Sequence, residues 1–359
     1  AFNRMLFAGT WESGGLQSRV FYTPARGTAD RGDDERIPNT LGVRNRFDLD
    51  EGTGGDNTGF AGPLYGAVYA FKYKQIRKIL PTGSPSPVFH IIDVSTTYGA
   101  LEQECIAVGE DAEGRPSIFF MDSQVGPMMT GPVPPTPIGD GIRDLWDSVN
   151  IAATTKVGQV LDYPAKRQVW FWWASGSSND PDVLAIYHKD TGAWSVYDTG
   201  GQIRSARAAT LFARTPGASM SRDLVPYVAQ TGANNRLIRC DTTDTDDNAT
   251  TFQAIVKTRP FAWNNGKPVR ATDVFLLAAA ASGVTLTVTA DLDLGRETRS
   301  ATVLLTADGT ETLIFKKVEG LDVSGGSFVQ FQIGDASAIA NSWRILSLWI
   351  PVAVEEANP

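Results

Sequence analysis

Cysteine and histidine, two residue types that build many metal sites and active sites, are scarce in this sequence. The 359 residues include two of each, Cys105, Cys240, His90 and His188. Structural zinc needs four Cys or His ligands in a characteristic spacing, and these four residues lie far apart along the chain. The sequence therefore predicts no zinc site. The two cysteines are interpreted as buried, reduced thiols.

Long hydrophobic runs are also missing. No apolar segment approaches the ~18 residues that cross a bilayer as a helix, and no secretory signal pattern stands at the start. The sequence therefore predicts no membrane segment. Because the chain begins with Ala1 and opens directly in strand-like sequence, we expect that an N-terminal part precedes it.

Positive charge is in deficit. Lys and Arg number 32 against 40 Asp and Glu, which gives a formal net charge of -8. A duplex-binding surface needs clustered basic residues to neutralise phosphates, so tight nucleic-acid binding is disfavoured, whereas transient passage of DNA is not. The one basic cluster, Lys72, Lys74, Arg77 and Lys78, mostly alternates along a strand pattern and is interpreted as a solvated face.

Glycine and proline, in contrast, are plentiful. The chain has 35 Gly and 20 Pro, and its hydrophobic fraction of 42% exceeds its charged fraction of 20%. The hydrophobic excess excludes a disordered chain. Many turn formers together with aromatic residues favour short strands over helices, so the composition indicates an all-β protein.

Strand-like segments recur in groups before Asp241. About five groups follow one another at intervals of roughly 40–50 residues, which is typical of β-propeller blades. The clearest segments are Gly66–Phe71, Gln75–Leu80, Ser117–Met121, Gln168–Trp173 and Val183–Tyr187. The spacing predicts that residues 1–241 form a β-propeller of about five or more blades.

Three segments interrupt the strands. Residues 23–62 are polar and are expected to form one long inserted loop that touches a partner, because loops beyond about 12–15 residues are usually functional or disordered. Residues 126–137 are proline-rich and are expected to hold no central strand, because proline cannot donate to a ladder. A helix is predicted over Asp140–Val149, with Ile142 and Trp146 on its apolar face.

The composition and the strand pattern of the sequence change after residue 241. Residues 242–249 have linker composition, and residues 250–359 contain about seven predicted strands. Several of these alternate apolar and polar residues, as Val284–Thr289 does, which places one face in a core and the other in water. The pattern predicts a C-terminal β-sandwich over residues 250–359.

The turn at Asp190–Trp194 resembles the Asp-box of sialidase-like propellers, Ser-x-Asp-x-Gly-x-Thr-Trp. It departs from that motif because His188 occupies the Ser position, the Thr is absent, and Trp194 arrives one residue early. An Asp-Gly turn before an aromatic strand is ordinary blade chemistry, since Asp caps the turn and Gly supplies a positive φ. We interpret the segment as structural.

Other patterns that suggest chemistry are also better explained structurally. The acidic loop Asp48–Asn57 offers oxygen ligands but lacks the spacing and terminal Glu of a twelve-residue calcium loop. The run Trp170–Trp173 is interpreted as packing rather than as a sugar platform, and Ser175–Ser178 lacks the context of a nucleophile elbow. The sequence gives no reason to bring two particular carboxylates together, and no phosphate-binding glycine motif precedes a helix. The sequence thus predicts no catalytic, cofactor-binding or metal-binding residue, no cofactor and no enzymatic activity.

Several segments, taken in order, resemble a family of phage tail and neck propeller proteins. The family's opening strands, Arg-hydrophobic-Phe-Ala-Gly-Thr and Ser-Arg-Val-Phe-Tyr, match Arg4–Thr10 and Ser18–Tyr22. The similarity continues through Ile118–Asn150, Val183–Asp198 and Ala254–Phe261. It implies a non-enzymatic structural component of a phage virion, located in a homo-oligomeric ring of the tail or neck such as a nozzle, hub or collar. Such a ring contacts other tail or neck proteins and lines or adjoins the DNA exit path.

The leading alternative is a carbohydrate-binding or carbohydrate-cleaving propeller that recognises a host receptor, with the C-terminal sandwich as a lectin-like module. A weaker one is a secreted bacterial lectin. An enzyme would gather two carboxylates with a Tyr or Arg in one concave site, whereas a ring component would expose flat or convex apolar areas. In a ring we expect any axis-facing surface to be neutral or acidic, with Lys72, Lys74 and Lys78 turned elsewhere.

Overall fold

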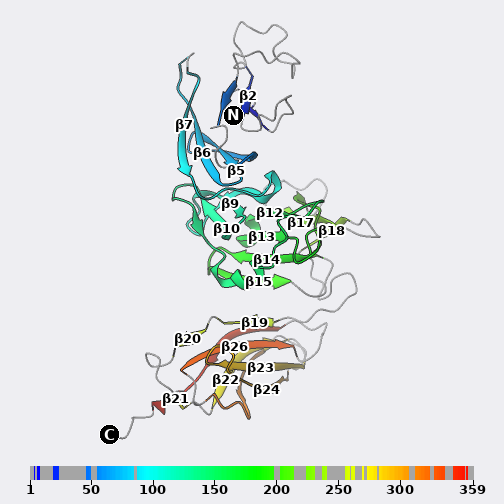
Figure 1. Ribbon diagram of the computed structural model, residues 1–359. Coiled ribbons are helices and arrows are strands. Elements are labelled where there is room, and N and C mark those ends of the chain that lie inside the picture. The colour runs from blue at the N-terminus through cyan, green and yellow to red at the C-terminus, as the bar shows by residue number, and fades with distance from the viewer. Residues whose placement is uncertain are drawn as a thin grey trace, which may run out of the picture. The chain divides into compact units, whose positions relative to one another are not determined.

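The computed structural model divides the chain into two compact units, residues 1–242 (unit 1) and 243–359 (unit 2). Nearly all regular structure is antiparallel β-sheet (Figure 1). The expected linker 242–249 lies outside the described residues. No helix within the described residues is long and apolar enough to span a membrane. The structure describes residues 4, 6–8, 19–23, 46–49, 55–84, 87–197, 203–213, 224–230, 237–240, 255–258, 260–262, 269–270, 273–280, 283–306, 312–323, 327–335, 343–351 and 353–354.

The described part of unit 1 contains five consecutive antiparallel sheets, each built from strands that follow one another along the chain. We name each sheet by its first and last strand. The sheets comprise β1 (Leu6–Ala8), β2 (Arg19–Tyr22) and β3 (Arg46–Asp48); β4 (Asn57–Leu64), β5 (Ala67–Lys72), β6 (Gln75–Pro81) and β7 (Phe89–Ser95); β8 (Ile106–Glu110), β9 (Pro116–Asp122), β10 (Gly126–Thr130) and β11 (Thr136–Pro137); β12 (Gly158–Tyr163), β13 (Gln168–Trp173), β14 (Val183–His188) and β15 (Ala193–Tyr197); and β16 (Ala208–Ala213), β17 (Leu224–Ala229) and β18 (Leu237–Arg239).

The last four sheets of unit 1 contact one another through their first strands. β4 contacts β8, β8 contacts β12, and β12 contacts β16. Each pair of neighbouring sheets encloses a separate group of buried side chains, which we call a seam. Because a small sheet has two faces and little area, each inner sheet buries apolar residues in two seams.

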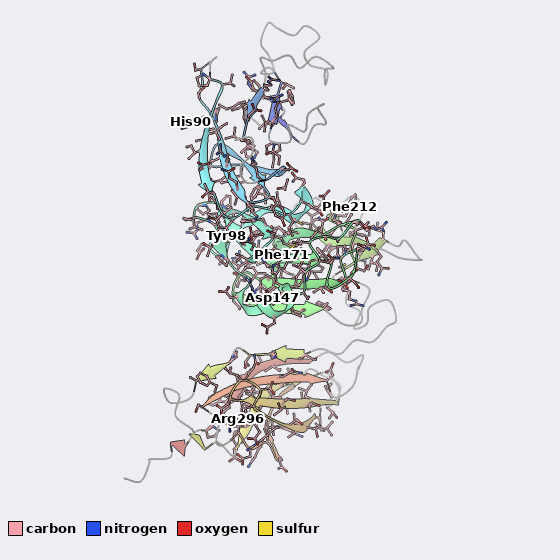
Figure 2. All side chains as sticks on the ribbon, viewed as in Figure 1. His90, Tyr98, Asp147, Phe171, Phe212 and Arg296 are labelled. Atoms are coloured by element: carbon pink, nitrogen blue, oxygen red, sulfur yellow. The ribbon has the colours of Figure 1, made fainter. Side chains whose placement is uncertain are left out.

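Strand β13 shows this burial on both faces. Phe171 and Trp173 pack toward sheet β8–β11 with Phe119 and Trp146, whereas Trp170 and Trp172 pack toward sheet β16–β18. In Figure 2, Phe171 lies among the strands of unit 1. Alternating side chains of one strand therefore fill two seams, which explains why the aromatic run is uninterrupted.

The segment expected to be one inserted loop, residues 23–62, contains β3 and most of β4. Strand β3 pairs with β2, and the Arg19 guanidinium Nε lies 2.9 Å from Asp48 Oδ1. Strand β4 pairs with β5 despite two register shifts. The polar composition hid these strands because their apolar side chains are few. Residues 24–45 and 50–54 lie outside the described residues.

The proline-rich segment 126–137 also differs from expectation. Strand β10 lies between β9 and β11, so the expectation of no central strand here was wrong. Pro127 is the second residue of β10 and sits opposite Met121, while its carbonyl accepts a hydrogen bond of 3.0 Å from the Ile138 N–H. Proline is tolerated at this position because the ladder uses its carbonyl and requires no N–H from it.

The expected helix Asp140–Val149 is shorter in the structure. A 3-10 turn, η3 (Asp140–Ile142), leads into the four-residue helix α1 (Arg143–Trp146). The chain then leaves the helix because Val149 pairs with Ser175 and the Asn150 N–H donates to the Ala174 carbonyl at 2.8 Å. Two more 3-10 turns, η2 (Gln103–Cys105) and η4 (Pro164–Lys166), precede β8 and β13.

The described part of unit 2 contains two larger sheets and one short strand pair. Sixteen buried residues form a single core; fourteen come from the two larger sheets, and Leu321 and Val323 lie outside the strands. Strand β23 supplies alternate residues to this core. The seven strands expected here are all present. The first sheet comprises β19 (Ile255–Lys257), β20 (Phe261–Ala262), β23 (Val284–Leu292), β24 (Glu297–Leu305) and β26 (Phe328–Asp335); the second comprises β22 (Val274–Ala280), β25 (Thr312–Val318) and β27 (Trp343–Trp349); and the pair comprises β21 (Val269–Arg270) and β28 (Ala353–Val354).

Candidate functional site

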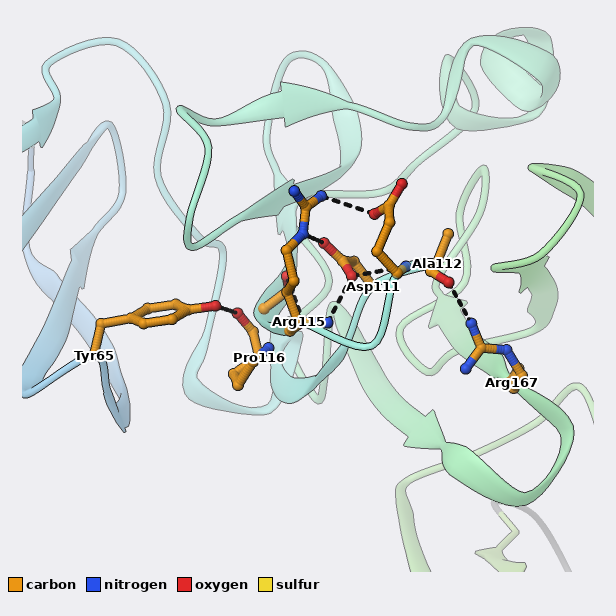
Figure 3. Close-up of polar contacts among 8 residues, drawn as sticks. Tyr65, Asp111, Ala112, Arg115, Pro116 and Arg167 are labelled. Atoms are coloured by element: carbon orange, nitrogen blue, oxygen red, sulfur yellow. Dashed lines mark hydrogen bonds and ion pairs between the residues drawn. The ribbon is translucent and has the colours of Figure 1, made fainter.

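A connected set of polar groups of unit 1 lies on three turns that join the first and second strands of consecutive sheets (Figure 3). We call this surface the turn face. Tyr65 Oη, from the β4–β5 turn, donates to the Pro116 carbonyl at 2.9 Å. Arg167 Nη2, at the end of η4, donates to the Ala112 carbonyl at 2.6 Å. The first and third turns are thereby both fastened to the middle sheet, β8–β11, through a backbone carbonyl.

The middle turn, Asp111–Arg115, is held by its own carboxylate. Asp111 Oδ1 accepts hydrogen bonds from the N–H groups of Glu113 (3.0 Å) and Arg115 (2.8 Å), and its Oδ2 accepts one from Arg115 Nε at 2.7 Å. Burial would raise the pKa of Asp111, but the backbone and side-chain hydrogen bonds of Arg115 hold that pKa below its ordinary value. The carboxylate therefore stays ionised and braces the turn.

A buried ion pair lies behind the turn face. Asp162, on β12, binds the Lys189 ammonium, whose Nζ also lies 5.2 Å from the centroid of the Phe119 ring on β9. Gly109, on β8, leaves the space that the carboxylate occupies, since a Cβ there would lie 2.3 Å from Asp162 Cγ. The pair thus belongs to the seam between sheets β8–β11 and β12–β15.

The environment of Asp162 disfavours its charged form. Burial raises its pKa, the Lys189 ammonium opposes that rise, and Glu110 adds to it. A raised carboxyl pKa is often found at catalytic sites. Here, however, the carboxylate is only 8% exposed and is already bound to the ammonium. The arrangement joins two sheets and offers no room for a substrate.

A second set of side chains joins four sheets near the starts of their first strands. Gln103 binds Phe60 of β4 twice, accepting from its N–H at 2.7 Å and donating to its carbonyl at 3.1 Å. Glu102 Oε1 accepts from the Val157 N–H at 2.9 Å, just before β12. Lys156 Nζ donates to the Arg207 carbonyl at 2.6 Å, just before β16. We call these bonds, together with those from Tyr65 to Pro116 and from Arg167 to Ala112, the inter-sheet clamps.

The basic cluster predicted to be a solvated face is partly buried, so that prediction was wrong. Lys72 is fully buried and its Nζ donates to the Leu49 carbonyl at 2.9 Å. Arg77 is also buried, with its Nε 3.1 Å from Asp93 Oδ1. Only Lys74 is exposed, whereas Lys78 is half-buried with its ammonium 5.5 Å from the Tyr69 ring centroid. The alternation argument failed because sheet β4–β7 has neighbours on both faces.

In the turn after His188 the glycine conformation agrees with the sequence interpretation, whereas the Asp190 carboxylate forms an ion pair with Arg167. Gly192 has a φ of 67° and donates its N–H to the His188 carbonyl at 2.8 Å. Asp190 Oδ1 lies 2.5 Å from Arg167 Nε and so supports the turn face. The His188 Nε2 lies 2.9 Å from Ser195 Oγ, and burial lowers the pKa of this histidine.

Within the described residues, the other candidate site residues named from the sequence form no recognisable metal site or active site. No group of three or more His, Cys, Asp or Glu within them could hold a metal ion. Cys105 and Cys240 are buried, and burial raises the pKa of Cys105 well above its ordinary value. The four residues Trp170–Trp173 are all buried core. Of the acidic loop Asp48–Asn57, residues 50–54 lie outside the described part.

Sequence reasoning missed the inter-sheet clamps. Gln103 and Phe60 are 43 positions apart, and Arg167 and Ala112 are 55 apart. Most of the clamps end on a backbone group, which any residue type supplies. No motif therefore marks them in a single sequence.

No family model matches this chain, and no curated protein matches it. Among solved structures, exo-β-1,3-galactanase from Phanerochaete chrysosporium with bound galactose is similar at 11% identity, over 98% of this chain and 80% of that chain, with a TM-score of 0.25. The S. cerevisiae core factor is similar at 8% identity, over 94% of this chain and 54% of that chain, with a TM-score of 0.30. Likeness at this level assigns neither fold nor function.

Proposed function

We propose that this chain is a structural component of a phage virion, part of a tail or neck ring that contacts neighbouring copies. The observation that carries the proposal is the set of inter-sheet clamps. Neighbouring sheets are joined by hydrogen bonds from the side chains of Arg167, Gln103 and Lys156. Side chains used in this way make a stiff body, which suits a component that transmits force and contact rather than chemistry.

The same proposal includes a finer description of the fold. We take the five sheets of unit 1 as propeller blades, with the contacting strands β4, β8, β12 and β16 as their innermost strands. Ringing small sheets buries each against its neighbours, which is the arrangement that the seams support. We take the two larger sheets of unit 2, which share one core, as a β-sandwich.

The sequence resemblance agrees with this proposal at its opening element. The segments similar to the family's first strand pair contain β1 and β2, which pair with each other in register from Leu6 opposite Tyr22 to Ala8 opposite Val20. The net charge of -8 suits a ring beside a DNA path. Repeated around an axis, it repels the phosphate backbone over the ~8–10 Å allowed by screening.

Electron microscopy of the phage particle that encodes this chain tests the proposal. Gold-labelled antibody against the chain should decorate the tail or the neck at one axial position. A particle preparation that contains no copy of the chain, as measured by mass spectrometry, would refute it. Binding of linear duplex DNA is the second measurement: micromolar affinity that weakens steeply with added salt would contradict the repelling path.

One observation favours the alternative function, recognition of a carbohydrate. The Asp162–Lys189 pair of unit 1 does not supply it, because that carboxylate is buried and already bound to the ammonium. It comes instead from unit 2, where aromatic side chains lie exposed on a sheet.

A further inference from the structure

One face of the three-stranded sheet β25–β22–β27 carries aromatic residues outside the core. Along β22, Val274 and Leu276 are fully buried in the core of unit 2, so Phe275 between them points to the opposite face. Phe315 on β25 and Trp349 on β27 share that face and are 58% and 60% exposed. We call this surface the aromatic face.

The rings of the aromatic face are ordered by one another and by the strands. Phe275 and Phe315 are parallel to within 2°, with centroids 5.4 Å apart. Trp349 lies directly opposite Phe275 in the β22–β27 register. Its indole N–H donates to Ser347 Oγ at 2.7 Å. The polar edge of the indole is thereby satisfied, and its flat apolar surface remains open.

A charged pair lies beside the rings. Lys317 is opposite Phe275 on the other neighbouring strand, and its Nζ lies 2.5 Å from Asp273 Oδ1. Both side chains are nearly half exposed, at 45% and 39%. Hydrogen-bond donors and acceptors are therefore available next to the aromatic surface. Lys316 points elsewhere, because its Nζ donates to the Leu304 carbonyl at 2.8 Å.

The size of the aromatic face argues against a protein partner. Three strands about 4.8 Å apart and seven residues long cover about 340 Å². Two such faces pressed together would bury about 700 Å², below the ~1,200 Å² of a stable specific interface. A second copy of the chain therefore cannot be held by this face alone. A ligand of two or three sugar rings matches its extent.

The chemistry of the aromatic face also argues against nucleic acid. Single strands bind where aromatic rings combine with a positively charged groove, but the Lys317 ammonium is neutralised by Asp273, and the chain carries a net charge of -8. Aromatic faces bear negative charge and attract polarised C–H groups. The axial C–H groups of a β-linked hexopyranose form such a face, and its equatorial hydroxyls require donors and acceptors at the side.

We propose that the aromatic face binds chains of β-linked hexopyranoses. The rings of Phe315 and Trp349 stack on the sugars, and the Lys317–Asp273 pair binds their hydroxyls. The inference concerns unit 2 and does not depend on the role proposed for the chain in a virion. The aromatic face could serve a ring component that also holds a surface glycan. It could equally serve a carbohydrate-binding protein that acts outside a virion.

Isothermal titration of the full chain with cellohexaose, laminarihexaose and β-1,4-galactohexaose tests the proposal. We expect at least one to bind, and Trp349→Ala to weaken its binding about tenfold or more, as for an aromatic anchor. Trp349→Phe should restore much of the loss because it retains a flat ring. Phe212→Ala is the matched control, since Phe212 is a 64% exposed aromatic residue of unit 1; this change should leave binding unaltered.

Several outcomes would overturn the proposal. One is absence of binding by all three hexasaccharides at millimolar concentration. Another is equal binding by the wild-type chain and Trp349→Ala. Light scattering that shows a dimer lost in Trp349→Ala would mean that a second copy covers the face. Binding of a thymidine oligonucleotide that Trp349→Ala abolishes would assign the rings to single-stranded nucleic acid instead.

Discussion

The two units use aromatic residues in opposite ways. In unit 1 the seams are filled by large rings, with Trp146, Trp172 and Trp173 among the most deeply buried side chains. In unit 2 the sixteen core residues that the structure describes include a single aromatic residue, Phe331. The exposed rings of that unit, Phe315 and Trp349 among them, lie outside its core.

The geometry of the sheets explains this difference. Small twisted sheets that meet at their first strands diverge from one another, and large rings fill the widening gap. Two longer sheets packed face to face leave a layer of even thickness, which Val, Leu and Ile fill. Exposed rings in unit 2 are therefore not required by packing, which is why they can be assigned to binding.

The two units should differ most in the free energy of unfolding that is lost when one tryptophan is removed from each. Trp146 is 2% exposed and its ring centroid lies 5.5 Å from that of Trp173. Trp146→Ala should lower the free energy of unfolding by about 3–5 kcal/mol, because it opens a cavity in the seam. Trp349→Ala should change it by about 0.5 kcal/mol or less. Urea unfolding followed by near-ultraviolet circular dichroism measures both, and similar losses would contradict the contrast.

Breaking one ion pair in each unit should give the next largest effect. Lys189→Met leaves the Asp162 carboxylate buried without its cation and should cost about 3 kcal/mol. Lys317→Met removes an exposed partner and should cost under about 1 kcal/mol. Adding Asp162→Asn to Lys189→Met should recover much of the loss, since it removes the buried charge. A double variant as unstable as the single one would show that packing, not charge, dominates at this site.

Asp111 should make the free energy of unfolding of unit 1 depend on pH in the acidic range. Its folded pKa lies below the ordinary 3.8, so its contribution is present above about pH 3.8 and is lost as the pH falls through the folded value. Asp111→Asn should cost about 1 kcal/mol at pH 7. We expect the difference between wild type and variant to shrink below pH 3.8 in urea melts. A difference that stays constant from pH 7 to pH 3 would count against an ionised, bound carboxylate.

The smallest expected effect concerns a single clamp. Tyr65→Phe removes the hydrogen bond to the Pro116 carbonyl and should cost about 0.5 kcal/mol, because Tyr65 is half exposed. Amide hydrogen exchange should then quicken in the Asp111–Arg115 turn and remain unchanged in unit 2. Unchanged exchange in that turn would show that the clamp contributes no rigidity.

Strands rich in apolar residues could be located from the sequence. Gln168–Trp173 was predicted with its observed bounds, and the strand predicted from Val284 differs only in ending at Leu292. Strands that form only because they pair with neighbouring strands could not be located from the sequence. β3 has three residues, and β10 begins with Gly126 and Pro127. Their pairing comes from adjacent strands, and no local pattern carries that information.

The burial of individual polar residues was equally hidden. Lys72 follows an apolar strand, as a solvated residue at a strand end would, yet it is fully buried because Leu49 from a distant segment covers it. The Asp162–Lys189 pair forms within one sheet, but its burial against Gly109 and Phe119 becomes visible only when the neighbouring sheet is added. The sequence thus indicated the strands and the absence of familiar motifs, whereas the contacts between sheets required the structure.

The double-sided strand β13 has a consequence for how the chain is made. Trp170 and Trp172 meet Ala206, Val228 and Cys240 in their seam, and these partners are synthesised later. A nascent chain that has reached Tyr197 on the ribosome therefore keeps two indole rings in water until the last sheet of unit 1 emerges. Such exposed apolar surface promotes aggregation of incomplete chains. A gene truncated between these points should yield insoluble protein even though four of the five sheets are encoded.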